Sequence, residues 1–268
     1  MTGSLISVFM LEVRQIIAGK KLLVVALLLA AAAALAFIVR RFAPDSEPGW
    51  PVIYMFMMTF LYLHTLVILV PLLFMTALIR EETDEGTLVY LVTRPVAKPM
   101  LLLTKFAAAA AVSATLIALG MVLFHAAYTL PGKAGAGDFD WAGRLSAFLR
   151  AGVLGVIGYG ALFTLAGVLM RRALIFGIAY GFLSELILSM FPAVIQKTTI
   201  MFYLRSTGLS GSGSWADREL DAALSLLDLA SPLRSAIVVL GASAAFLAMS
   251  CVVVSVREFV ESRGAEAT

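Results

Sequence analysis

Long apolar stretches alternate with short polar segments along the chain. The first stretch, residues 22–39, lies between two lysines and two arginines. About 20 apolar residues in a helix cross the hydrocarbon core of a bilayer, and charged residues collect where such a helix leaves it. The pattern therefore predicts six transmembrane helices, at residues 22–39, 51–79, 101–130, 145–170, 173–194 and 235–256.

The composition agrees with an integral membrane protein. Of 268 residues, 61% are hydrophobic and 14% are charged, whereas soluble domains have about half apolar and about a quarter charged residues. Abundant alanine and glycine, as in residues 107–111, favour closely packed helices over a β-barrel. We expect one all-α transmembrane domain over residues 1–268, with no room for a separate soluble domain.

Charge and cysteine content exclude other classes. The net charge is +3 and the basic residues lie at segment ends, which is unlike the basic stripe of a nucleic-acid-binding protein. A single cysteine, Cys251, excludes an internal disulfide framework.

The residues before the first span predict an amphipathic helix on the membrane surface. Leu5, Phe9, Val13 and Ile16 recur at helical spacing, with polar residues between them. We interpret residues 1–21 as an elbow helix. Lysines followed by an apolar run also resemble a cleavable signal peptide, but a secretory leader does not need this preceding helix.

Six spans place both termini on the same side, which we assign to the cytoplasm of a bacterial inner (plasma) membrane. The best local support is Arg171-Arg172 in a very short connection, because basic residues in short loops favour the inside. Residues 195–234 then form an outer connection. Gly208 to Ser214 is typical of a flexible link and a further helix follows it, either as a plain connection or as a cap over a transport path.

The most informative polar segment, residues 80–98, lies between the second and third spans. It opens with four acidic side chains in five residues and continues with apolar residues at helical spacing. Charges this dense do not enter lipid, so the segment predicts a short amphipathic helix at the membrane edge. Thr93-Arg94-Pro95 ends this helix, since proline disfavours helical geometry in the preceding residue.

These residues, with the pattern E-x-x-x-E-G-T-L-x-x-L-x-T-x-P-x-x-K, resemble the cytoplasmic segment of ABC exporter permeases of the type-2 class. The resemblance implies an N-terminal elbow helix, six spans, a coupling helix between spans two and three, and a longer outer connection between spans five and six. It also implies a permease subunit that works as a homodimer, or as a heterodimer with a sister permease.

The resemblance further implies coupling to a separate ABC ATP-binding subunit, which binds ATP and Mg²⁺. Glu81, Glu82, Glu85 and Arg94 would supply polar contacts to that subunit, and Leu88 and Leu91 would be apolar anchors. Gly86, Thr87 and Pro95 complete the matching motif. The chain has no phosphate-binding motif of the type G-x-x-x-x-G-K-[ST], so we expect no catalytic residue and no cofactor in this chain.

Small residues at helical spacing indicate close contacts between helices. Gly177 and Gly181 in the fifth span, and Ala151, Gly155 and Gly158 in the fourth, would let two backbones approach. They serve either a dimer interface or packing inside one chain, and the sequence leaves both open.

Ionisable residues within spans mark a possible transport path. Glu185 in span five, His64 in span two and Arg150 in span four each cost free energy in lipid unless they face protein or water. Glu185 is either a polar point on the path and a partner of the other two, or a structural carboxylic acid.

Other chemistries fit less well. Met55, Met57, Met58 and His64 could bind a soft metal, but Met57 does not share a helical face with Met55 and Met58, which favours ordinary packing, so we expect no metal site. Ser210, the candidate nucleophile of an intramembrane protease, lies in a Gly/Ser link outside the spans. The remaining alternative is a secondary transporter driven by an ion gradient, for which the repeated halves with broken helices are not visible. The transported substrate cannot be read from the sequence.

Overall fold

The computed structural model describes residues 2–42, 50–76, 78, 97–130, 140–170, 172–186, 196–210 and 229–256. Every regular element among these residues is a helix, as expected. In chain order they are α1 (Thr2–Ala18), α2 (Lys20–Phe42), α3 (Trp50–Met57), the π-helix η1 (Met58–Leu66), α4 (Val67–Met75), α7 (Lys98–Thr129), α8 (Trp141–Leu169), α9 (Ala173–Leu186), α11 (Ile200–Leu209) and α13 (Pro232–Val256).

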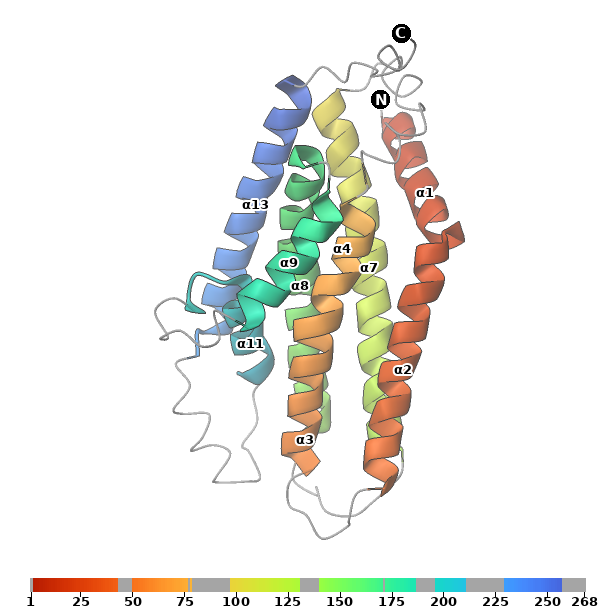
Figure 1. Ribbon diagram of the computed structural model, residues 1–268, viewed down its shortest axis with the longest axis vertical. Coiled ribbons are helices and arrows are strands. Elements are labelled where there is room, and N and C mark those ends of the chain that lie inside the picture. The colour runs from red at the N-terminus through yellow and green to blue at the C-terminus, as the bar shows by residue number, and fades with distance from the viewer. Residues whose placement is uncertain are drawn as a thin grey trace.

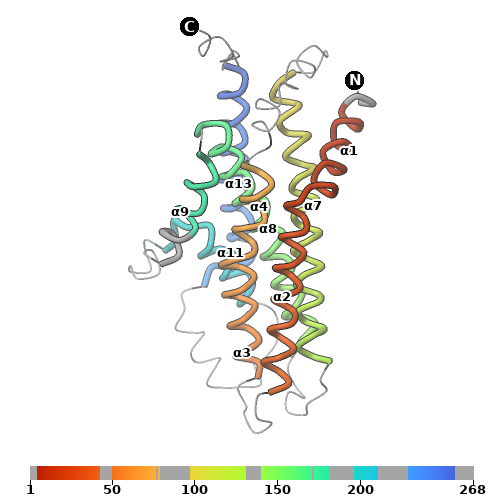
Figure 2. The backbone as a smooth tube through the Cα atoms, turned by 45° about the vertical axis from the view of Figure 1, so that its right-hand side comes forward, coloured from red at the N-terminus to blue at the C-terminus, as the bar shows by residue number. Residues whose placement is uncertain are grey.

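The helices form one elongated bundle (Figures 1 and 2). α8 is the most enclosed helix and packs against α4, α7, α11 and α13, while α2 packs on α7. The start of α1, the start of α7 and the end of α13 lie at the same end of the bundle, the upper end in both figures. We call this the terminal end.

Five stretches of the described chain are long and apolar enough to cross a membrane. They are Lys20–Phe42, Trp50–Met75, Lys98–Thr129, Trp141–Leu169 and Pro232–Val256. Five of the six predicted spans thus have a counterpart, which confirms a protein that crosses the membrane several times.

The predicted fifth span, residues 173–194, differs from the others. α9 covers only 14 residues of it, about 21 Å of helix against about 30 Å of hydrocarbon. Residues 187–195 lie outside the described part of the chain, so the six-span count stays a prediction. The chain then forms α11 within the expected outer connection, and α11 packs on α8. Gly208 belongs to this buried helix and is not part of a flexible link.

The N-terminal residues are helical as expected, but α1 does not lie across the end of the bundle. It runs alongside the upper part of α7 and meets α2 at Gly19 (Figures 1 and 2). The reason is that one face of α1, with Val8, Glu12 and Ile16, is buried in the protein. The sequence pattern showed that α1 has an apolar side without showing that part of this side packs on protein.

The second span is built from three consecutive segments: α3, η1 and α4. In η1, the widened turns place side chains over carbonyls five residues earlier: His64 Nδ1 lies 3.0 Å from the Thr59 oxygen and Thr65 Oγ1 donates to the Phe60 oxygen. π-helical turns are rare and often mark functional sites. The sequence predicted this span but not its π-helix.

Glycines let α8 occupy the centre. A Cβ added at Gly155 would collide with Val67 Cγ1 and would lie 2.7 Å from Leu204 Cδ1. α4 and α11 therefore approach the backbone of α8 on this side more closely than any side chain would allow. Gly155 is thus a contact inside the chain, one of the two possibilities that the sequence left open.

Candidate functional site

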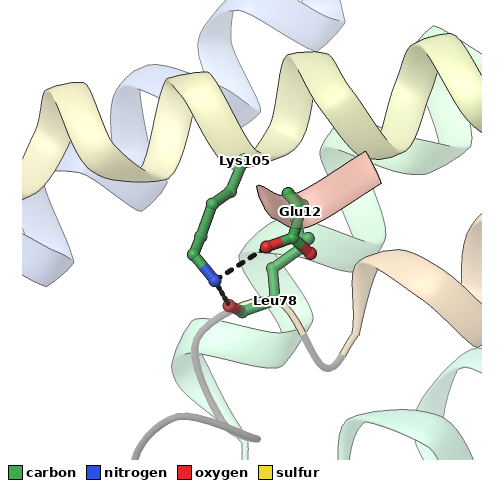
Figure 3. Close-up of polar contacts among 3 residues, drawn as sticks. All are labelled: Glu12, Leu78 and Lys105. Atoms are coloured by element: carbon green, nitrogen blue, oxygen red, sulfur yellow. Dashed lines mark hydrogen bonds and ion pairs between the residues drawn. The ribbon is translucent and has the colours of Figure 1, made fainter. Parts of the chain in front are cut away.

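A buried ion pair joins the N-terminal helix to the third span. Lys105 Nζ in α7 lies 2.9 Å from Glu12 Oε2 in α1 (Figure 3), and the two side chains are only 5% and 10% exposed. Burial of a charge is costly, and removing one partner of a buried pair costs about 3–5 kcal/mol because the other charge stays behind. Each of the two charges is therefore tolerated in the interior only because the other compensates it.

The same ammonium group also holds the chain where it leaves the second span. Lys105 Nζ donates a hydrogen bond to the carbonyl oxygen of Leu78 at 3.2 Å (Figure 3). Leu78 lies two residues before Arg80, where the acidic segment 80–98 starts. Lys105 thus connects α1, α7 and the beginning of this segment. We call Glu12, Lys105 and Leu78 the junction.

Neighbouring residues fix the chain just before the junction. Thr76 Oγ1 donates to the Leu72 carbonyl oxygen at 2.7 Å, which continues the bonding of α4 past its last turn. A Cβ added at Gly167 of α8 would lie 2.5 Å from the Thr76 carbonyl oxygen. The backbone of α8 therefore contacts this part of the chain directly, and a larger residue at position 167 would displace it.

The other end of the segment is also held by helices. Ala97 is extended and Pro99 lies in the first turn of α7, where proline is well tolerated. Leu102, one turn later, forms a small apolar cluster with Val168 of α8 and Val254 of α13. Residues 78 and 97 are therefore both tied to the bundle. This arrangement suits the transmission of a displacement between residues 79–96 and the spans.

The residues expected to contact an ATP-binding subunit lie outside the described part of the chain. They are Glu81, Glu82, Glu85, Gly86, Thr87, Leu88, Leu91, Arg94 and Pro95. Their role stays a prediction, and the structure supplies only their two flanks. In the sequence, Lys105 stands out only as a basic residue near the start of the predicted span 101–130. Its partner Glu12 was not recognised, since nothing in the sequence pairs residues so far apart.

The three candidates for the transport path lie on different helices. His64 is half-buried in η1, where its ring stacks on that of Phe60 with centroids 5.8 Å apart. Arg150 is exposed on α8 and its Nε donates to the Ser146 carbonyl oxygen one turn earlier. Glu185 lies in the last turn of α9, and its side chain is outside the described part of the structure. A path through these residues stays a prediction.

The glycine pair of α9 packs inside the chain. A Cβ at Gly177 would collide with Leu72 Cδ1 of α4, and one at Gly181 would lie 3.2 Å from Ile68 Cγ2. Of the two possibilities that the sequence left open, this is packing inside one chain. A contact between two copies through the same face stays a prediction.

A cluster of aromatic rings at the opposite end of the bundle was not foreseen. The Arg40 guanidinium, at the end of α2, lies 4.1 Å above the Trp50 ring, and Tyr128 Oη donates to the Trp50 carbonyl oxygen at 2.9 Å. Tyr54 Oη lies 3.0 Å from His125 Nδ1. Tryptophans near span ends were the available signal, because such rings collect at membrane interfaces. The cluster ties α2, α3 and α7 together.

The methionines among the sequence candidates for a metal site pack in or against the hydrophobic core. Met55 and Met58 are buried in the main hydrophobic core. Within the described ranges, no three His, Cys, Asp or Glu side chains are grouped so that they could hold a metal ion.

Comparison with known proteins gives one clear result. The model of a family described as ABC-2 family transporter protein matches residues 19–204, more than half of the chain. The matched region contains segment 80–98 and Lys105, whereas Glu12 precedes it and α13 follows it. No curated protein matches the chain at a significant level.

Proposed function

Because the chain belongs to the ABC-2 family of transporter proteins, we propose that it is the permease subunit of an ATP-driven exporter. The family and the apolar helices make it a multi-pass membrane component of an ABC transporter. The proposal adds the direction of transport, the dependence on ATP and the way in which energy reaches the spans.

In this proposal, segment 80–98 docks on a separate ATP-binding subunit, which holds ATP and Mg²⁺. Glu81, Glu82 and Glu85 meet basic side chains there, Arg94 meets an acidic one, and the apolar residues between them fill a groove. ATP-driven closure of the partner moves the docked segment. The attached spans follow and alternate between two arrangements of the path.

The single observation that supports this mechanism most is the anchoring of both flanks of the segment. Leu78 is bonded to Lys105, and Leu102 packs with α8 and α13 close behind residue 97. A force applied to the chain between Leu78 and residue 97 is therefore passed mainly to the spans.

A complete path would require a second permease copy, identical or related, because the described helices of one chain pack closely around α8. The path would then lie between the two copies. The terminal end would face the cytoplasm of a bacterial plasma membrane, where ATP is available. Glu185, His64 and Arg150 remain the proposed polar points of the path.

The test is a double charge reversal in the proposed docking segment, Glu82→Lys with Glu85→Lys. The permease is co-expressed with an ABC ATP-binding subunit that co-purifies with the wild type, and the complex is purified in lipid nanodiscs. We expect the reversal to reduce co-purification of that subunit and permease-dependent ATP hydrolysis at least tenfold, because like charges then meet across the interface. Membrane insertion is expected to stay normal.

The matched control is Asp217→Lys with Glu219→Lys, which makes the same charge change in the proposed outer connection. It should leave both quantities close to those of the wild type. Wild-type binding and hydrolysis in the segment variant would contradict the proposal. Transport that continues without any ATP-binding subunit would favour the ion-gradient alternative.

A further inference from the structure

Glu12 occupies an unusual place for a carboxylate. Its neighbours on the buried face of α1 are apolar, with Val8 one turn before it and Ile16 one turn after it. An apolar residue at position 12 would bury itself there without the desolvation cost of a charge, and replacing a buried ion pair by apolar residues is often neutral or stabilising. Stability alone therefore does not account for the pair.

Of the parts joined at the junction, α1 is the least embedded. Much of its surface is outside the protein core: Ile6, Met10, Leu11 and Ile17 are exposed apolar side chains, and Arg14 and Gln15 are exposed polar ones. α7, in contrast, packs against α1, α2, α4, α8 and α13. Relative movement at the junction is thus easier for α1 than for α7.

The chain between α1 and α2 permits such movement. Gly19 is the one residue between the end of α1 and the start of α2, and the bonds of its own backbone, Gly19 N to the Ile16 oxygen and Leu22 N to the Gly19 oxygen, span three residues instead of the four of an α-helix. Glycine gives a joint between helices more freedom than any other residue. α1 can therefore tilt about Gly19 while α2 stays in place.

One ammonium group joins this movable helix to the start of segment 80–98. Lys105 Nζ is bonded to Glu12 of α1 and to the Leu78 carbonyl at the same time, and Figure 3 shows both bonds meeting at this one atom. A displacement of Leu78 changes the position of the ammonium group. The Glu12 carboxylate must then follow or lose its partner in a site shielded from water.

We propose that the Glu12–Lys105 pair is a positioning contact that transmits the ATP-driven displacement of segment 80–96 to α1, so that the N-terminal helix moves with each cycle. The inference rests on the proposed function. It adds a part of the chain, α1, that lies outside the region matched by the family. Glu12 and Lys105 act through the Leu78 backbone and touch neither nucleotide nor substrate.

The test compares hydrogen exchange in the complete complex of permease and ATP-binding subunit, in nanodiscs, without nucleotide and after trapping with ATP and vanadate. Peptides from residues 2–18 report on α1, and peptides from residues 80–96 report on segment 80–98. In the wild type we expect trapping to change exchange in both. In Lys105→Met combined with Glu12→Leu, we expect the change in residues 2–18 to fall at least threefold while that in residues 80–96 persists.

The apolar double variant separates transmission from stability, because it leaves no unpaired charge. Its melting temperature should equal or exceed that of the wild type. The conservative variant Lys105→Arg keeps both bonds and should retain the response of α1. If the double variant does not fold, the comparison of Lys105→Arg with Glu12→Gln gives the same readout, with a weakened response of α1 expected only in Glu12→Gln.

The outcomes distinguish the two proposals. A wild-type complex in which residues 80–96 respond but residues 2–18 do not would overturn this inference alone. A full response of α1 in the apolar double variant would overturn it as well. Absence of any response in residues 80–96, or failure of the chain to assemble with an ATP-binding subunit, would overturn the proposed function and this inference with it.

Discussion

Buried charges in the described part of the bundle are few, and each has a specific compensating contact. Lys105 pairs with Glu12, Arg144 donates from Nη1 to the Leu209 carbonyl oxygen, and Arg40 lies over the Trp50 ring. In the sequence these residues look like ordinary solvent-exposed charges. Their partners come from other helices, so only the folded chain shows which charges are buried and why this is tolerated.

At the residue scale, glycine positions offer a direct test of the packing. We expect Gly155→Val to destabilise the protein by about 1–3 kcal/mol, because its side chain would collide with Val67 and Leu204 and overpacking costs about this much. The measurement is thermal unfolding of the purified protein in detergent.

The matched control is Gly241→Val. Gly241 is also in a spanning helix, and apart from its chain neighbours and the backbone of its own helix no atom lies within 4 Å of a Cβ at this position. Its unfolding should change little. Equal destabilisation by both variants would mean that loss of glycine itself, and not the contact around α8, is responsible.

At the element scale, the second span illustrates a limit of sequence patterns. All residues of α4 are apolar, so the sequence pattern indicates a buried span. The pattern does not indicate how tightly the helix is wound. The π-helix η1 and Pro71 inside α4 lie between the aromatic cluster and the junction. The element that leads into segment 80–98 therefore has two places where the regular helical bonding is altered.

The contact of α9 with α4 can be tested by crosslinking. In a Cys251→Ala background, cysteines at Gly177 and Leu72 should form a disulfide within one chain under mild oxidation, since the Leu72 side chain now fills the space beside Gly177. The product is identified by mass spectrometry of the digested protein.

A single cysteine at Gly177 is the corresponding control, and we expect it to remain a monomer on a non-reducing gel. A covalent dimer formed by this single variant would instead support the prediction that Gly177 and Gly181 lie between two copies.

At the scale of the whole molecule, the two ends of α8 define opposite sides of the bundle. Ala142 in its first turn and Met170 after its last turn are both exposed. If the terminal end faces the cytoplasm, a cysteine at Ala142 in the Cys251→Ala background should react with a membrane-impermeant maleimide in intact cells. A cysteine at Met170 should react only after permeabilisation. The reverse pattern would place segment 80–98 outside the cell, away from ATP, and the proposed coupling would be wrong.

The sequence by itself determined that the chain is helical and crosses a membrane, and it pointed through segment 80–98 to the family that the comparison confirmed. These properties depend on residues close together in the chain, because entry into lipid is decided by the apolarity of each stretch of about 20 residues. Only the tertiary structure decided that α1 packs along α7, that Gly155 and Gly177 face partners in the same chain, and that Lys105 meets Glu12 and Leu78. Those contacts join residues far apart in sequence, and they depend on shape and on the need to compensate buried charge, which no local pattern encodes.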